Sequence, residues 1–284
     1  MNRTVYLNGA WLDEADAHVS IFDRGFLFAD AIYEVTGVVN GKLLEYEGHS
    51  ARLQRSMAEL GLACPLSPEE LLGVHREIVK RNGLNEGLIY LQISRGPADR
   101  DFAFPANPVP TLVLFTQSKA VLDNPKAQTG ISVALLPDLR WARRDIKTVQ
   151  LLYPSMAKME AASQGADDAW LVEDGFVTEA SSASAHIITS NGVLVTRPLS
   201  QAILHGITRH STLDIAAAIG IPVEERPFSV EEAKTAAEAF ITSATNFVLP
   251  VTKIDGLPIG DGIPGPLTLK LRELYIAQKT TSAI

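Results

Sequence analysis

One lysine, Lys147, has surroundings that suggest chemistry. It lies near the end of a charged and aromatic stretch, residues 138–148, and a mostly apolar segment, residues 149–156, follows it. Most lysines are solvated surface charges, whereas a catalytic lysine supplies an amine that attacks a carbon atom or carries a proton. A catalytic role for Lys147 therefore requires partners elsewhere in the chain: an acid, a cradle for an anion and a trap for a carboxylate.

Two stretches have the composition of an anion cradle. In residues 205–209 a glycine turn opens a predicted helix, whose free N–H groups can face a phosphate beside the Thr208 hydroxyl. In residues 240–246 a buried strand ends in a turn rich in hydroxyl groups. Arg52, on a predicted helix, can supply a cation. Each feature also has a plain structural interpretation: a helix cap, an ordinary turn and a surface arginine.

Glu179 is the candidate acid. It lies in residues 176–184, where small hydroxyl side chains indicate a hydrogen-bonded carboxylate, although a hairpin edge would have the same composition. The six histidines are scattered and form no metal motif. The glycine-rich dinucleotide fingerprint and the phosphate-loop lysine motif are both missing from the sequence.

Local signals predict the elements that must position these residues. Asn-Gly pairs at 8–9, 40–41 and 191–192 predict hairpins, because both positions of such a turn tolerate positive φ. Helical periodicity with caps predicts a helix over residues 49–60, ended by Gly61, and another that begins at Ser67. Further strands and helices alternate along the rest of the chain, so we expect an α+β protein.

We expect two domains joined by a short linker. The predicted ranges are residues 1–117 for a small N-terminal α/β domain, 118–128 for a polar linker and 129–284 for a larger C-terminal domain. The chain has 284 residues, which is long enough to bury a core in each domain.

Composition and charge restrict the class of protein. A net charge of -8 and a pI of about 5.3 argue against a nucleic-acid partner. The single Cys64 excludes an internal disulfide and suits a reducing cytoplasm. The start of the sequence, residues 1–9, lacks a signal-peptide core, and no apolar run approaches the roughly 18 residues of a membrane helix. We therefore expect a soluble cytoplasmic protein.

Taken in order, these motifs make the sequence resemble the fold-type IV pyridoxal 5'-phosphate (PLP) enzymes, a family that includes D-amino acid aminotransferase, branched-chain aminotransferase and aminodeoxychorismate lyase. The likeness spans nearly the whole chain and is carried by the residues 23–25, 30–35, 50–53, 140–141, 145–147, 177–182 and 204–209. It implies a class IV aminotransferase with a β-barrel-like core in the large, PLP-binding domain. It also implies a homodimer.

The resemblance assigns roles to individual residues. It implies that Lys147 forms the Schiff base with PLP and that Glu179 binds the pyridine nitrogen, which stays protonated so that the ring accepts electrons from the substrate. The cofactor-binding residues that it implies are Arg52, Glu179, Leu204, Ile207, Thr208, Ser243 and Ala244. The substrate-binding residues that it implies are Tyr33, Val35, Tyr90, Arg100 and Phe102.

The segment Tyr33-Glu34-Val35 is similar to the D-amino acid aminotransferase pattern. The loop of residues 95–105 is also similar, with Arg100 matching the arginine that traps the substrate carboxylate from the neighbouring subunit. Phe102 stands where the family pattern has a histidine, and Ala244 where many relatives have a phosphate-binding threonine. We expect the first departure to make the substrate pocket more apolar and the second to weaken cofactor retention.

The predicted reaction is ping-pong transamination, through pyridoxamine phosphate, between a D-amino acid and a 2-oxo acid such as 2-oxoglutarate or pyruvate. The alternatives are an (R)-amine or branched-chain amino acid transaminase of the same fold, an aminodeoxychorismate-type lyase and a non-catalytic PLP-binding protein. The expected partners are small amino and oxo acids and a second copy of the chain, with neither nucleic acid nor membrane.

Overall fold

The computed structural model describes residues 3–284, so the first two residues of the expected N-terminal domain lie outside it. The chain divides by packing into two compact units. The first holds the described residues up to Ala120 together with residues 146–150 and 282–284, and the second holds residues 121–145 and 151–281. The segment of Lys147, which we grouped with the larger domain, packs with the first unit. The expected domain boundaries themselves stay a prediction.

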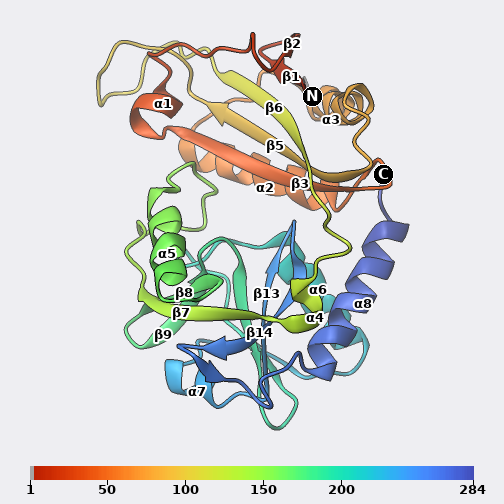
Figure 1. Ribbon diagram of the computed structural model, residues 1–284. Helices are drawn as coiled ribbons and strands as arrows, with labels where there is room; N and C mark the ends of the chain where they lie inside the picture. The colour runs from red at the N-terminus through yellow and green to blue at the C-terminus, as the bar shows by residue number, and fades with distance from the viewer. Residues whose placement is uncertain (1–2) are drawn as a thin grey trace. The chain divides into compact units, whose positions relative to one another are not determined.

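The first unit is a six-stranded antiparallel sheet with helices α2 and α3 packed on it (Figure 1). Its strand order is β2-β1-β6-β5-β3-β4. The strands are β1 (Thr4–Leu7), β2 (Ala10–Asp13), β3 (Ala31–Val39), β4 (Lys42–Leu43), β5 (Glu86–Ser94) and β6 (Thr111–Ser118). The helices are α1 (Arg24–Phe28), α2 (Tyr46–Leu60) and α3 (Pro68–Arg81).

Local signals in the sequence explain where these elements turn and end. Asn8 and Asn40 both have positive φ and are each followed by a glycine of positive φ, as a two-residue hairpin turn requires. Gly61 ends α2 with a φ of 59°. Ser67 caps α3 in a reciprocal capping box with Glu70. The two predicted hairpins, the end of α2 at Gly61 and the start of α3 after Ser67 are therefore confirmed, whereas α2 begins at Tyr46, three residues before the predicted start.

The second unit has a nine-stranded mixed sheet in the order β12-β11-β10-β13-β14-β7-β8-β9, with β15 paired to β14. Its strands are β7 (Ile131–Pro137), β8 (Asp168–Glu173), β9 (Phe176–Ala180), β10 (Ser184–Ile188), β11 (Leu194–Thr196), β12 (Val223–Glu225), β13 (Glu238–Ser243), β14 (Phe247–Ile254) and β15 (Leu257–Pro258). Its helices are α4 (Lys126–Thr129), α5 (Leu152–Ser163), α6 (Ile207–Ala218), α7 (Val230–Lys234) and α8 (Pro266–Thr281).

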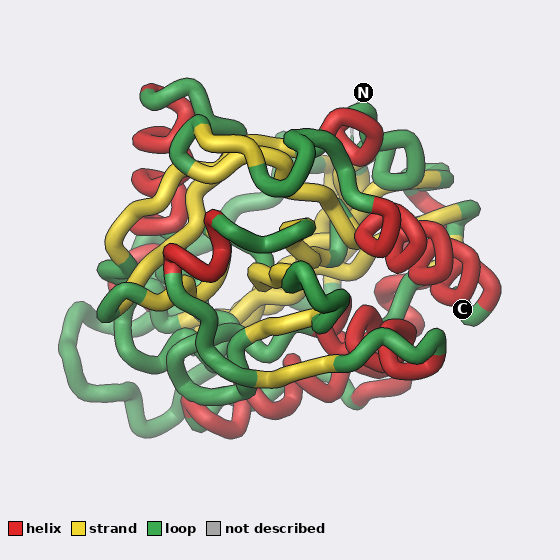
Figure 2. Tube along the Cα trace, turned by 90° about the horizontal axis from the view of Figure 1, so that it is seen from below, coloured by secondary structure: helices red, strands yellow, loops and turns green. Residues whose placement is uncertain are grey.

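This sheet curls. Strands β9 and β10 are far apart in the sheet order, yet three residues join them and Ala180 N–H donates to the Ala183 carbonyl at 2.8 Å. The end of the sheet must therefore return toward its middle. The buried core of this unit includes Val133, Trp170, Ile187 and Phe228, and its helices lie toward the outside of the strands (Figure 2). The expected α+β fold with a barrel-like core is confirmed.

Among residues 3–284, no helix combines the length and the apolar composition that a membrane span requires.

Candidate active site

Lys147 is held against the edge of β3 by main-chain hydrogen bonds. Tyr33 N–H donates to the Lys147 carbonyl at 3.0 Å, and Val149 N–H donates to the Ala31 carbonyl at 3.1 Å. The side chain then reaches over an aromatic ring, with Nζ 4.1 Å from the Tyr33 ring centroid. Within the described residues Lys147 has no carboxylate partner. Its amine is thus positioned without being committed to an ion pair.

Three of the expected substrate residues lie together on one face of the same sheet. In the strand register Val35 faces Tyr90, and Tyr90 faces Phe115. The Tyr33 and Tyr90 rings stack at 5.6 Å, and Tyr90 stacks on Phe115 at 4.8 Å. Burial raises the pKa of the Tyr90 hydroxyl, and so does the neighbouring Tyr33. The hydroxyl therefore stays protonated and donates to Gln92 at 2.9 Å.

Arg52 is buried on α2 and paired with a carboxylate that the sequence analysis did not assign. Its Nε and Nη2 donate to the two oxygens of Glu34 at 2.7 and 2.8 Å, and His49 Nδ1 lies 2.9 Å from the same carboxylate. Burial opposes the charge on Glu34, but the Arg52 guanidinium and the His49 hydrogen bond hold the pKa of Glu34 well below its usual range. Arg52 is therefore fixed in place by an ionised partner.

Arg100 and Phe102 lie on the loop between β5 and β6. Both side chains are exposed, Phe102 to 79%.

Glu179, in the second unit, is a buried acid with a guanidinium partner. Arg140 Nη1 donates to one oxygen at 2.7 Å, and the Leu204 N–H donates to the other at 3.0 Å. Burial raises the pKa of Glu179, while Arg140 and the Leu204 amide oppose that rise. Arg140 is itself fixed by Asp138, to which it donates from Nε and Nη2 at 2.9 and 2.7 Å.

The first anion cradle predicted from the sequence is the start of α6. The helix begins at Ile207 after Gly206, and no side chain caps it. A Cβ atom at position 206 would lie 2.8 Å from the Ser184 hydroxyl, so a larger residue there would displace that side chain. Thr208 is buried with its hydroxyl 3.4 Å from that of Tyr275. The N–H groups of the first helical turn lack helical partners, which makes this end suited to a phosphate.

The second predicted cradle is the turn between β13 and β14. Ser243 Oγ accepts the Asn246 N–H at 3.2 Å, and Ala244 is half-buried beside it.

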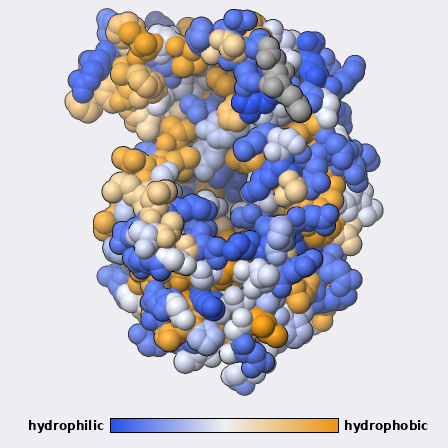
Figure 3. Space-filling model, in the orientation of Figure 1, coloured by the Kyte–Doolittle hydropathy of each residue, from blue (hydrophilic) through white to orange (hydrophobic). Residues whose placement is uncertain are grey.

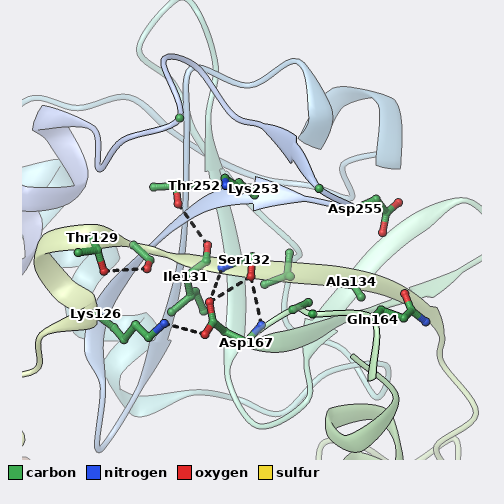
Figure 4. A pocket seen from close by; sticks show the side chains of 16 residues that line it. Lys126, Thr129, Ile131, Ser132, Ala134, Gln164, Asp167, Thr252, Lys253 and Asp255 are labelled. Atoms are coloured by element: carbon green, nitrogen blue, oxygen red, sulfur yellow. Dashed lines mark hydrogen bonds and ion pairs between the residues drawn. The ribbon is translucent and has the colours of Figure 1, made fainter. Parts of the chain in front are cut away.

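A pocket of about 720 Å³ lies elsewhere in the second unit (Figure 4). Of its two lining carboxylates, Asp167 already accepts from Lys126 and Ser132. None of the predicted site residues lines this pocket.

The sequence did not predict Arg140, Glu34 and His49 as partners of the site residues. Arg140 and Glu34 both lie in motifs that carried the resemblance, and the His49-x-x-Arg52 spacing places two polar side chains on one helix face. Those were the available signals. Among the described residues no cluster of potential metal ligands occurs.

The chain belongs to the amino-transferase class IV family, whose model matches residues 31–254. The D-alanine aminotransferase of Bacillus licheniformis is 39% identical over 266 residues, 93% of each chain. That of Staphylococcus aureus (strain N315) is 40% identical over 272 residues, 95% of each chain. A solved branched-chain amino acid aminotransferase from T.th., with pyridoxamine 5'-phosphate, has a TM-score of 0.91 and 26% identity over 99% of this chain and 95% of its own. The family and the enzyme class expected from the sequence are confirmed.

Proposed function

We propose that the protein transfers an amino group between a D-amino acid and a 2-oxo acid, with PLP as its cofactor. The observation that carries the proposal is the 39–40% identity to D-alanine aminotransferases over nearly the whole chain. The Tyr33-Glu34-Val35 segment, which is similar to the D-amino acid pattern, supports it from the sequence.

Polar groups of the second unit fit the chemistry of PLP. The buried Glu179 carboxylate suits a basic ring nitrogen, and the uncapped start of α6 with Thr208 suits a phosphate. We propose that Arg52, Ile207, Thr208, Ser243 and Ala244 hold the phosphate, that Leu204 packs on the ring and that Lys147 holds the cofactor covalently. When bound, PLP supplies an electron sink for the substrate Cα.

Lys147 is the proton carrier in this proposal. A correctly placed amine accepts a proton from the substrate Cα in its neutral form and returns a proton in its ammonium form. Its contact with the Tyr33 ring and the lack of a carboxylate partner among residues 3–284 favour correct placement of the amine. Glu179, kept ionised by Arg140, holds a proton on the pyridine nitrogen.

Tyr33, Val35 and Tyr90 form the substrate face of the sheet in the first unit, and Arg100 binds the substrate carboxylate. Phe102 replaces a polar donor with an apolar ring beside that arginine.

We propose a homodimer in which the Arg100 loop serves the site of the neighbouring subunit. Exposed apolar side chains gather over α1 and the loop between β5 and β6, as Figure 3 shows. They are Ile21, Phe22, Phe26, Phe102, Phe104 and Val109. Exposed apolar clusters of this kind usually mark interaction surfaces. Sedimentation velocity is expected to give a dimer, and a monomer at micromolar concentration would contradict this part of the proposal.

We also place the enzyme in the cytoplasm, where the free thiol of Cys64 would stay reduced.

The test is a set of half-reactions with purified holoenzyme. D-Alanine is expected to change the cofactor absorbance and to yield pyruvate, with 2-oxoglutarate restoring the starting spectrum. Lys147→Ala is expected to abolish both signals, because the amine is lost. The variant Lys158→Ala, on the exposed side of α5, serves as the matched control.

Reaction with L-leucine or (R)-1-phenylethylamine in place of D-alanine would favour the branched-chain or (R)-amine alternative. Repeated turnover of aminodeoxychorismate with no 2-oxo acid present would favour the lyase, because a transaminase stops after one half-reaction. Turnover of Lys147→Ala at the wild-type rate would refute the central assignment.

A further inference from the structure

Arginine and phenylalanine side chains alternate in a row across α1 and the loop between β5 and β6. In order, the members of this arginine–phenylalanine row are Arg95, Phe104, Arg24, Phe28, Arg100 and Phe102. The successive distances from guanidinium carbon to ring centroid are 3.7, 5.4, 4.5, 5.6 and 5.7 Å. All fall within the range over which a ring face attracts a cation.

The charges along the row are not equivalent. Arg95 and Arg24 are buried and share the carboxylate of Asp30, at 2.7 and 2.8 Å. Arg100 is exposed and has no acidic partner among residues 3–284. Its positive charge is therefore met only by the faces of Phe28 and Phe102. The charges of Arg95 and Arg24 are thus compensated by Asp30, while the charge of Arg100 is available to an anion.

The main chain that carries Arg100 is also fixed by the row. Arg24 Nη1 donates to the Asp101 carbonyl at 2.6 Å and to the Ala103 carbonyl at 3.4 Å. These two carbonyls flank Phe102, and the first follows Arg100 directly. A single buried guanidinium thus holds the loop backbone on both sides of the aromatic ring that contacts Arg100.

The two ends of the loop are tied to the start of α1. Asp23 caps α1 and accepts from Ser94 at 2.9 Å, where β5 ends, and from Thr111 at 2.7 Å, where β6 begins. At the neck of the loop Gly96 approaches the Val109 carbonyl so closely that a Cβ atom would lie 1.8 Å from it. The loop is therefore built into the fold from its neck to the segment that bears Arg100.

We propose that Arg24 and Phe28 are positioning residues for Arg100, and that Phe102 completes the holder in which this guanidinium receives a carboxylate. The inference rests on the proposed function, in which Arg100 binds the substrate carboxylate. The family pattern has a histidine at position 102, which would add a donor for the substrate. Here the ring face orients the arginine instead, so carboxylate binding depends on how well Arg100 is held.

The test compares Michaelis constants of holoenzyme variants with D-alanine as the varied substrate and 2-oxoglutarate as acceptor. Phe28→Leu and Phe102→Leu each remove one ring face and keep an apolar side chain. Each is expected to raise KM by about two- to five-fold, and the pair by about five- to twenty-fold, with kcat within two-fold of wild type. The reason is that a less ordered arginine weakens carboxylate binding without altering the reacting groups.

Two controls separate positioning from folding. Phe28→Tyr keeps the ring and is expected to return KM to within two-fold of wild type. Phe176→Leu removes an exposed phenylalanine of the other unit and serves as the matched substitution.

Arg24→Lys keeps the charge beside Asp30 but loses the planar face and the forked donors, and is expected to raise KM by about ten-fold or more.

Wild-type KM values in both leucine variants would overturn the inference, as would a fall in thermal stability with no change in KM for Arg24→Lys. A wild-type enzyme that transfers no amino group from any donor would instead overturn the proposed function, and this inference would fall with it.

Discussion

At the scale of single residues, the acid at the centre of the proposed chemistry depends on one arginine. Glu179 is buried, and burial raises the pKa of its carboxyl. Arg140 opposes that rise through a 2.7 Å hydrogen bond and its charge, and burial of Arg140 is in turn compensated by Asp138. Thr178 donates to Asp138 at 2.6 Å and completes the set. The charge on Glu179 therefore depends on Arg140, Asp138 and Thr178 as well as on its own burial.

We expect Arg140→Met to move the acidic limb of the pH profile of kcat to higher pH, by about one to three pH units. The reason is that a nearby opposite charge shifts the pKa of a carboxyl group by about that amount. The sign follows from the loss of the cation: Glu179 then holds its proton to higher pH, and the neutral acid would stabilise a protonated pyridine nitrogen less well. Steady-state rates between pH 5 and 10 would measure the shift. Arg143→Met, which removes a partly exposed arginine nearby, is the matched control. An acidic limb unchanged in Arg140→Met would contradict this role.

At the scale of secondary structure, β3 carries side chains of the proposed site on both faces of its sheet. Side chains alternate along a strand, so Tyr33 and Val35 point to one face while Ile32, Glu34 and Thr36 point to the other. The burial pattern follows this alternation, with the first pair half-exposed and the second set buried. One face thus carries proposed substrate residues, and the other carries the carboxylate that holds Arg52 on α2.

We expect Glu34→Gln to lower the free energy of unfolding by about 3 kcal/mol or more near pH 7, because Arg52 would be left buried without its ionised partner. The folded-state pKa of Glu34 is depressed, so the stabilisation is fully present above its ordinary value of 4.5 and is lost progressively as the pH falls from there toward the depressed pKa. The difference between wild type and variant should therefore shrink in acid. Chemical denaturation at pH 7 and at about pH 3 measures it, with the exposed Glu47→Gln as control. A constant difference at both pH values would rule out the ion pair as the cause.

At the scale of the whole molecule, the chain passes between its two units four times, at residues 120/121, 145/146, 150/151 and 281/282. The short passage of residues 146–150 brings Lys147 to the first unit, whereas Glu179 and the predicted phosphate cradle of α6 belong to the second. The last residues return to the first unit, where Leu43 and Ile284 exchange main-chain hydrogen bonds of 2.8 and 3.2 Å. Lys147 is therefore assigned to a different unit from Glu179.

We expect removal of PLP to lower the melting temperature by about 5–10 °C. A ligand at 100 times its dissociation constant stabilises the folded state by about 2.7 kcal/mol, which corresponds to a shift of that size in a chain of this length. Scanning calorimetry of holoenzyme and of enzyme stripped with a pyridoxamine-forming donor would measure it. Equal melting temperatures would argue against PLP binding to the folded chain.

The substitution Ala244→Thr tests the affinity for PLP directly. The added hydroxyl is expected to tighten PLP binding by about five-fold, the effect of one hydrogen bond. A nanomolar dissociation constant in the wild type would contradict the expectation that Ala244 weakens cofactor retention.

The sequence by itself determined the features whose causes are local. Asn8-Gly9 and Asn40-Gly41 turn hairpins because both positions adopt positive φ, and Ser67 starts α3 because its own side chain caps it. The family, and with it the set of expected site residues, also followed from short motifs in a fixed order. Each of these signals lies within a few neighbouring residues, so no knowledge of the packing was needed.

Only the tertiary structure showed which side chains pair with one another. Glu34 meets Arg52 across 18 positions of the chain, Arg140 meets Glu179 across 39, and Arg24 meets the Asp101 carbonyl across 77. Strand register and helix packing select such pairs among many residues of the same type, and no local propensity encodes that selection. Lys147 is a further case. The residues before and after the segment 146–150 belong to the second unit, but main-chain hydrogen bonds to β3 place Lys147 in the first.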